Sequence, residues 1–179
     1  MNKIVFMKTI HHSLLILLSA IGLFASCASQ KQTTGASPAV SEAVTAQQYT
    51  FVASSVFPTE DSRFNPRLLL PNAANLYQLT SRYDVRVTPD SVIAYLPFFG
   101  RSYTAPTDPT KGGIKFTSTK FGYKKTQRKN NYEIEITPKD NNEVQSLYFT
   151  VSPSGFASLR VLSLNKTPIS FNGDIEPNK

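Results

Sequence analysis

The chain has 179 residues, a formal net charge of +7, two histidines, one cysteine and no tryptophan. Both histidines and the cysteine lie within the first 27 residues, so the rest of the chain contains neither an imidazole nor a thiol. That part of the chain excludes a Ser-His-Asp or Cys-His catalytic pair, a metal site with imidazole or thiolate ligands, and an internal disulfide. Enzymes built on carboxylates or on Ser-Lys pairs remain open. We predict a protein that is not an enzyme and that uses no metal and no cofactor.

The N-terminal segment has the features of a bacterial lipoprotein signal. Lys3 and Lys8 precede an apolar run over residues 14–24, which is well short of the roughly 20 residues that a spanning helix needs. Small residues then lead to Cys27, and this arrangement resembles the lipobox of bacterial lipoproteins. We expect residues 1–26 to be a lipoprotein signal peptide and the thiol and amine of Cys27 to be acylated. The alternatives are a free cysteine in an uncleaved anchor and a chance residue after an ordinary cleavage site.

Cleavage before Cys27 leaves 153 residues with a net charge of +5, enough for one domain with a proper core. Residues 27–47 are expected to form the lipidated cysteine and a flexible tether, because residues 28–46 are rich in Ser, Thr, Gln and Ala without apolar periodicity. A short helix over residues 40–48 is the alternative. Ala28 is not the aspartate associated with inner-membrane retention, and no acidic cluster resembling a surface-export signal follows it. We therefore expect an exported protein, anchored by its acyl chains in the outer membrane with its domain in the periplasm.

Residues 48–179 have the sequence pattern of an all-β domain. Tyr49 begins a strand that ends near Pro58, and an irregular stretch around Leu68–Leu70 follows. Alternating apolar and polar residues then recur between turn signals. Further strands are expected over residues 83–87, 91–97, 114–117, 132–136, 147–151, 156–164 and 169–171. Helical periodicity is nearly absent, so we predict a single antiparallel meander domain of seven to nine strands, either a sandwich or a partly closed barrel.

The segment YLPFFGRSY, which follows a predicted strand, is the candidate ligand-binding loop. Phe98 and Phe99 are adjacent, so in an extended chain one enters the core while the other lies at the surface. Gly100 permits a turn with positive φ, and Arg101 and Tyr103 then share a face that suits sugar, peptide or anion binding. The alternative is that both phenylalanines fill the core and that Arg101 forms a structural salt bridge. The candidate binding residues are Phe98, Phe99, Arg101 and Tyr103.

This segment, the lipobox and the sequence PISFNG at residues 168–173 together resemble a family of Bacteroidetes lipoproteins, domain of unknown function 4251. The family pattern is Leu-Pro-Tyr/Phe-Phe-Gly-Arg after a strand, followed by an aromatic residue and Ala-Pro. Tyr103, Ala105 and Pro106 fit that pattern. The resemblance covers about residues 48–173. It implies a location and a fold rather than an activity, and no catalytic residue is carried over with it.

A basic segment without acidic residues occupies residues 111–129. Its basic residues are Lys111, Lys115, Lys120, Lys124, Lys125, Arg128 and Lys129. On strands, Lys115 can share an exposed face with a hairpin partner that contains Lys124, and such a patch suits anionic lipid headgroups, lipopolysaccharide or acidic glycans. Aromatic residues interleave with the lysines as in nucleic-acid binders, but export makes nucleic acid a poor partner. The alternative is a solvated hairpin whose lysines prevent edge pairing.

Glu133 and Glu135 lie two residues apart on one strand face. Paired carboxylates serve hydrolysis or calcium binding. Here they lie opposite the apolar face of the strand, so we interpret them as surface residues. We expect them to pair with lysines of the preceding strand across a hairpin at Asn130-Asn131.

Three functional hypotheses follow. The first is a non-catalytic, lipid-anchored cell-envelope protein, a binding or assembly module whose contact surface combines the loop over residues 98–103 with the basic hairpin. The second is a structural envelope-accessory lipoprotein without a small-molecule ligand. The third is a histidine-independent carboxylate hydrolase. The expected partners are the membrane, through the acyl chains, and an envelope protein, a glycan or an anionic lipid, but no nucleic acid.

Overall fold

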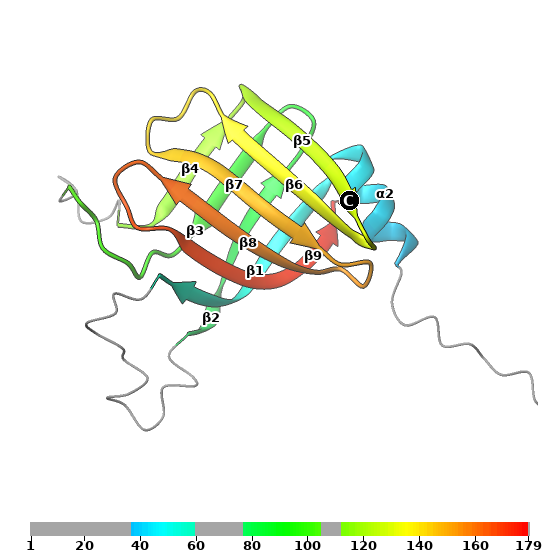
Figure 1. The fold of residues 1–179 in the computed structure, drawn as a ribbon, viewed down its shortest axis with the longest axis horizontal. Helices are drawn as coiled ribbons and strands as arrows, with labels where there is room; N and C mark the ends of the chain where they lie inside the picture. The colour runs from blue at the N-terminus through cyan, green and yellow to red at the C-terminus, as the bar shows by residue number, and fades with distance from the viewer. Residues whose placement is uncertain (1–36, 60–76, 105–111, 179) are drawn as a thin grey trace, which may run out of the picture. The chain divides into compact units, whose positions relative to one another are not determined.

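Nine antiparallel strands form one continuous sheet in the order β4-β3-β2-β1-β9-β8-β7-β6-β5 (Figure 1). The computed structural model describes residues 37–59, 77–104 and 112–178, all within the compact unit Thr34–Lys179. The strands are β1 Tyr49–Pro58, β2 Gln78–Val87, β3 Val92–Leu96, β4 Ile114–Ser118, β5 Phe121–Arg128, β6 Asn131–Pro138, β7 Val144–Val151, β8 Phe156–Ser163 and β9 Ile169–Pro177. The predicted all-β, antiparallel class is confirmed.

The sheet curls into a nearly closed barrel, so the barrel alternative is right and the sandwich is wrong. Most strands pair with their neighbours in sequence, as a meander does. One pairing departs from that pattern, because β1 lies between β2 and β9. The strands β4 and β5 are the two edges of the sheet, and no ladder joins them in the described structure. Lys115 on β4 and Lys124 on β5 therefore do not share a hairpin, contrary to the sequence prediction.

The inward-facing residues of the strands fill the barrel and form its core. Phe149 of β7 is buried and packs edge-on against Tyr49 and Phe51 of β1, with ring centroids 6.2 Å and 5.7 Å apart. On β6, buried Ile134 and Ile136 alternate with outward residues. This alternation explains why the period of two in the sequence located the strands.

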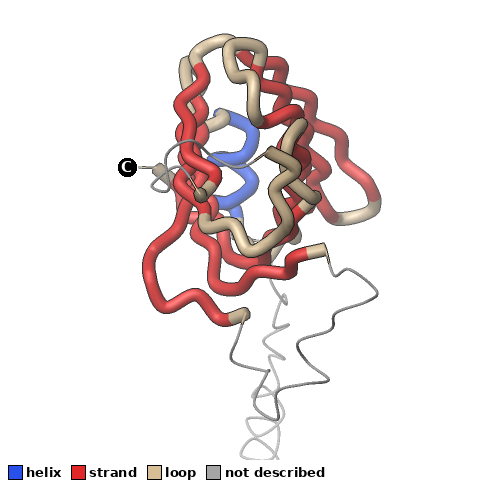
Figure 2. The backbone as a smooth tube through the Cα atoms, turned by 90° about the vertical axis from the view of Figure 1, so that its left-hand side faces the viewer, coloured by secondary structure: helices blue, strands red, loops and turns tan. Residues whose placement is uncertain are grey.

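A short helix, α2 (Pro38–Ala46), precedes the barrel, so the expected flexible tether is wrong for this part of residues 27–47 and the helical alternative is close. Proline at the start of the helix costs no hydrogen bond, because the first helical N–H groups have no internal acceptor. The buried face consists of Val40, Ala43 and Val44. In Figure 2 the helix is seen within the ring of strands.

Tyrosine hydroxyls fix α2 to the barrel. The Oη of Tyr123 on β5 donates to the carbonyl oxygen of Val44 at 3.3 Å, and the Ser41 and Tyr132 hydroxyls lie 2.7 Å apart. Burial is the main cause that raises the pKa of Tyr123. This end of the barrel, which also contains the β5–β6 turn, is called the helix end below.

A carboxylate closes the corner between the two edge strands. Only Thr119 and Lys120 separate β4 from β5. The carboxylate of Asp140 accepts hydrogen bonds from the Ser118 hydroxyl and from the backbone N–H groups of Thr119, at 2.9 Å, and Lys120, at 3.1 Å. These bonds, the Ser118 hydroxyl first, lower the pKa of Asp140 to about 2.

Several sequence predictions fall on residues outside the described ranges. They concern the signal peptide over residues 1–26, the acylation of Cys27, the leucines 68–70 and Lys111. Among the described residues, no helix combines the length and the apolar character of a membrane-spanning segment.

Candidate functional site

Two loops meet at the barrel end opposite α2. The first, residues 97–103, follows β3, and the second, residues 164–168, joins β8 to β9. We call them the loop pair. An antiparallel bridge joins Ser102 to Lys166, and hydrogen bonds flank it on both sides. They run from Tyr103 N–H to Asn165 O at 2.9 Å, from Thr167 N–H to Arg101 O at 2.9 Å, and from Arg101 N–H to Thr167 Oγ1 at 3.1 Å.

Gly100 is needed here because the side chains of Thr167 and Phe98 approach its Cα closely. It does not have a positive φ, so the reason that the sequence analysis gave for this glycine is wrong. Among the described glycines, Gly155 is the one with positive φ. A Cβ atom on Gly100 would lie 2.5 Å from Thr167 Oγ1 and 2.7 Å from Phe98 Cζ. Any other residue at this position would force the side chains of Thr167 and Phe98 to move.

Lys166 links the second loop of the loop pair to the start of β4. Its side chain is only 11% exposed, and its Nζ donates to the carbonyl oxygen of Gly113 at 2.8 Å. The same Nζ lies 5.5 Å from the ring centroid of Phe98 and 3.9 Å from the Glu143 carboxylate. The loop pair therefore has a polar interior contact as well as backbone pairing.

The outer surface of the loop pair carries three large exposed apolar side chains. Phe98 packs against the core, whereas Phe99 is 56% exposed, which confirms that the two rings take opposite sides and rejects the alternative that both are buried. Tyr103 is 67% exposed and Leu164, on the second loop, is 61% exposed. The side chain of Arg101 is also exposed. Leu164 is absent from the sequence-based candidates, because it was placed at the end of a strand.

The basic segment is distributed over different surfaces. Lys115 lies on the ring of Tyr95, with Nζ 4.7 Å from the centroid, and Tyr95 stacks on Tyr83 at 5.5 Å. Lys125 turns towards the helix instead, where its Nζ lies 3.0 Å from Thr45 Oγ1. Lys124 lies on the outer face opposite Glu135.

The remaining members of the basic segment lie in or near turns. The Lys120 N–H belongs to the Asp140 corner, and Lys129 has a φ of 55° in the β5–β6 turn at the helix end. Arg128, at the end of β5, lies 3.8 Å from Glu133. The loop pair and this turn lie at opposite ends of the barrel, so they do not form the combined surface that the sequence analysis expected.

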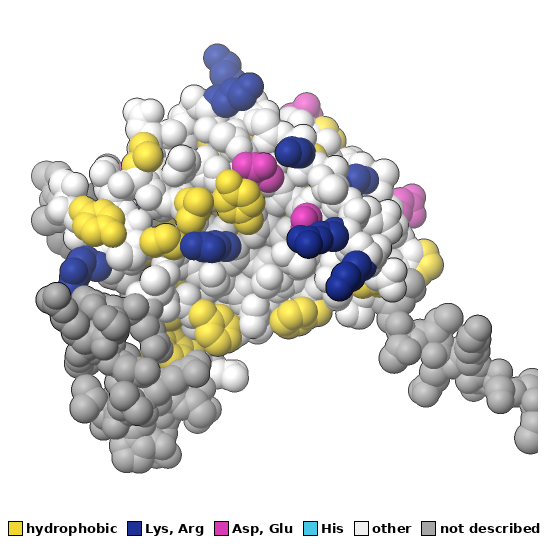
Figure 3. Space-filling model, viewed as in Figure 1, with side chains coloured by type: hydrophobic (Ala, Val, Ile, Leu, Met, Phe, Trp, Pro, Cys, Tyr) yellow, Lys and Arg dark blue, Asp and Glu magenta, His cyan; other side chains and the backbone are white. Residues whose placement is uncertain are grey.

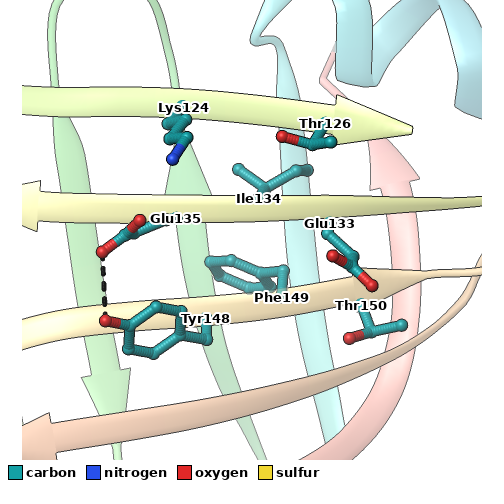
Figure 4. A pocket seen from close by; sticks show the side chains of 8 residues that line it. All are labelled: Lys124, Thr126, Glu133, Ile134, Glu135, Tyr148, Phe149 and Thr150. Atoms are coloured by element: carbon teal, nitrogen blue, oxygen red, sulfur yellow. Dashed lines mark hydrogen bonds between the residues drawn. The ribbon is translucent and has the colours of Figure 1, made fainter. Parts of the chain in front are cut away.

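A hollow of about 260 Å³ lies on the outer face of β5, β6 and β7 (Figure 4). We call it the outer-face hollow. The Tyr148 hydroxyl donates to Glu135 Oε1 at 3.0 Å and holds the tyrosine side chain across the strands. Glu133 lies two residues before Glu135 on β6. The lining residues are Lys124, Thr126, Glu133, Ile134, Glu135, Tyr148, Phe149 and Thr150.

A second hollow, of about 450 Å³, lies at the helix end, between the start of α2 and the β5–β6 turn. Its lining is formed by Ser37, Pro38, Ser41, Gln127, Asn130, Tyr132 and Pro153. Within residues 37–59, 77–104 and 112–178, no group of three or more His, Cys, Asp or Glu side chains is placed to hold a metal ion.

The comparison with known families matches most of the described fold. A family model described as a domain of unknown function (DUF4251) matches residues 31–175, which include α2, all of β1 to β8 and most of β9. No curated protein matches the chain. The match also covers the loop pair and the outer-face hollow. Because it extends over far more than half of the sequence, the chain belongs to the DUF4251 family.

Proposed function

We propose that this protein is a non-catalytic, lipid-anchored module of the cell envelope that binds an envelope protein through the loop pair. The observation that carries the proposal is the exposure of Phe99, Tyr103 and Leu164 on two loops that are held together by backbone pairing. Exposed aromatic side chains on a preorganised surface lose little conformational entropy when they are buried by a partner. Such a surface suits protein binding better than a purely structural role.

The place of the loop pair in the barrel supports the proposal. The chain enters the described structure at the helix end, where the Ser37 N–H donates to Pro153 O at 2.8 Å. Ser37 follows Cys27 by ten residue steps, which is about 33 Å at full extension. An acylated Cys27 would keep the helix end within that distance of the membrane. The loop pair, at the opposite end, would then be presented away from the membrane.

The sequence supports the proposed location and the lipid anchor. The lipobox-like segment before Cys27 favours export and acylation, and the residues after it favour the periplasmic side of the outer membrane. Acylation is tested by mass spectrometry of the N-terminal peptide, and Cys27→Ser should release the protein from the membrane fraction. Recovery of an unmodified Cys27 peptide from the native membrane contradicts the anchor.

A crosslinking pulldown from the native envelope tests the binding surface. The test variant replaces Phe99, Tyr103 and Leu164 together by serine. The matched control replaces Ile93 and Tyr95, two exposed apolar residues on the outer face of β3, by serine as well. We expect wild type and control to recover the same envelope protein in stoichiometric amount, and the loop-pair variant to lose it.

The other outcomes of this experiment are equally informative. A loop-pair variant that folds and keeps its partner places the binding surface elsewhere. Recovery of no protein partner by wild type supports the structural, ligand-free lipoprotein instead. Both glutamates of β6 line the outer-face hollow, so glycan cleavage by wild type that is abolished by Glu135→Gln would contradict the non-catalytic assignment.

A further inference from the structure

Two rows of outward-facing side chains, all polar except Phe57, cross six strands on the outer face of the barrel. Strand register places the members of each row directly opposite one another, from β5 to β1. The first row is Lys124, Glu135, Tyr148, Arg160, Ser170 and Phe57. The second row is Thr126, Glu133, Thr150, Ser158, Asn172 and Ser55. The outer-face hollow lies over the β5–β7 part of both rows.

The charges of these rows balance, although the chain as a whole carries +7. Lys124 and Arg160 contribute two positive charges, and Glu133 and Glu135 contribute two negative ones. Beside the rows, Arg128 lies 3.8 Å from Glu133 and adds one positive charge. In Figure 3, which faces this side of the sheet, basic, acidic and hydrophobic side chains are interspersed. A surface so close to charge balance gives little net attraction to a polyanion such as an acidic glycan or an anionic lipid.

The hydrogen-bonding groups suit a ligand that both donates and accepts. Carboxylates accept, Lys and Arg donate, and the Ser, Thr and Asn side chains do both, which matches the hydroxyl groups of a sugar. Tyr148 supplies the aromatic face, since its side chain is 38% exposed and its hydroxyl is held by Glu135 at 3.0 Å. A held ring loses little freedom when a ligand covers it.

The dimensions favour a chain of sugars rather than a single one. Neighbouring strands are about 4.8 Å apart, so the five steps from β5 to β1 follow about 24 Å of the curved outer surface. Tyr148, in the middle of the first row, and Phe57, at its end, are both partly exposed aromatic residues. A ligand chain that bends with the barrel surface can contact both rows at once.

We infer that the outer face of β5 to β1 binds a neutral oligosaccharide, which lies along the two rows and stacks on Tyr148. This site is separate from the loop pair, so it and the proposed protein-binding function fail independently. In the native envelope the two sites can be occupied together, because the loop pair lies at the end of the barrel and the rows lie on its side.

Isothermal titration calorimetry of the full-length chain in detergent tests the inference. The probes are maltohexaose, cellohexaose and chitohexaose, which are neutral, and hexagalacturonate, which is acidic. We expect saturable binding of at least one neutral hexasaccharide, and weaker binding of the acidic one. Tyr148→Ala should weaken the neutral interaction at least tenfold.

Two variants make the result specific to the site. Tyr95→Ala removes a similarly exposed aromatic side chain from the outer face of β3 and should leave the affinity unchanged. Glu135→Gln tests the same site with a smaller change and should also weaken binding. The inference is overturned if no neutral probe binds, if the acidic probe binds more tightly, or if folded Tyr148→Ala and Glu135→Gln bind like wild type.

Discussion

Replacing Lys166 by methionine should loosen the loop pair and lower the stability of the whole domain. Methionine keeps most of the side-chain volume but removes the ammonium group. The hydrogen bond from Nζ to Gly113 O, at 2.8 Å, is charge-assisted, and such bonds contribute about 1.5–3 kcal/mol. The contact with the Phe98 ring adds about 0.5–1 kcal/mol.

The ion pair with Glu143 adds little to this total, because that carboxylate is 64% exposed and 3.9 Å away, so the pair contributes at most about 1 kcal/mol. One effect opposes the loss, since removing a largely buried charge recovers part of its desolvation cost. The net loss should be about 2 kcal/mol in the free energy of unfolding, which for a domain of this size lowers Tm by about 4–8 °C.

Thermal unfolding followed by circular dichroism measures the change, and hydrogen exchange locates it. The Tyr103 and Thr167 amides, which close the loop pair, should exchange faster in Lys166→Met than in wild type. Lys139→Met removes an exposed charge and serves as the control, with a Tm close to that of wild type. A Tm for Lys166→Met equal to or above that of wild type would refute the reasoning, because burial of the lysine would then cost more than its contacts contribute.

Three further changes test other parts of the structure. Gly100→Ala should lower the free energy of unfolding by about 1–3 kcal/mol through the clash with Phe98 and Thr167, and an unchanged urea midpoint would show that the loops can separate freely. Asp140 has a pKa lowered to about 2 by its hydrogen bonds to the corner, so its stabilising effect is complete above about pH 4 and is lost as the pH falls towards 2. Asp140→Asn should therefore reduce the difference in Tm between pH 5 and pH 2.5, and an unaltered difference contradicts this role. Phe149→Ala should cost about 3–5 kcal/mol in urea unfolding, and a loss below about 1 kcal/mol would mean that the core collapses around the missing ring.

The strands could be predicted where one face packs on the core. On β6, the alternation around Ile134 and Ile136 survives in the structure because only one face of the sheet is buried. The helix α2 gave no comparable signal, since three buried residues, Val40, Ala43 and Val44, define its apolar face over nine positions. Such a short pattern depends on packing against the barrel rather than on local propensity.

The site was predicted only as far as local sequence reaches. Adjacent phenylalanines before a glycine identified the first loop, and the opposite placement of Phe98 and Phe99 followed from the extended chain. The role of Gly100 and the participation of Leu164 depend on a second loop more than 60 residues away, which no local pattern announces. For the same reason the sequence left sandwich and barrel undecided, because that choice rests on the pairing of β1 with β9.

The pairing of β1 with β9 sets the order in which the barrel can fold. Residue 49 pairs with residue 177, so β1 gains its second neighbour only after nearly all of the described chain is present. Contacts between residues so distant in sequence slow folding, because loop closure costs entropy before any contact compensates for it. Until then, β1 and β8 each present an unpaired edge on which strands of other chains can assemble. Gly173 allows β9 to pair with β1, because β9 passes so close to the Val52 carbonyl that a side chain at position 173 would overlap it.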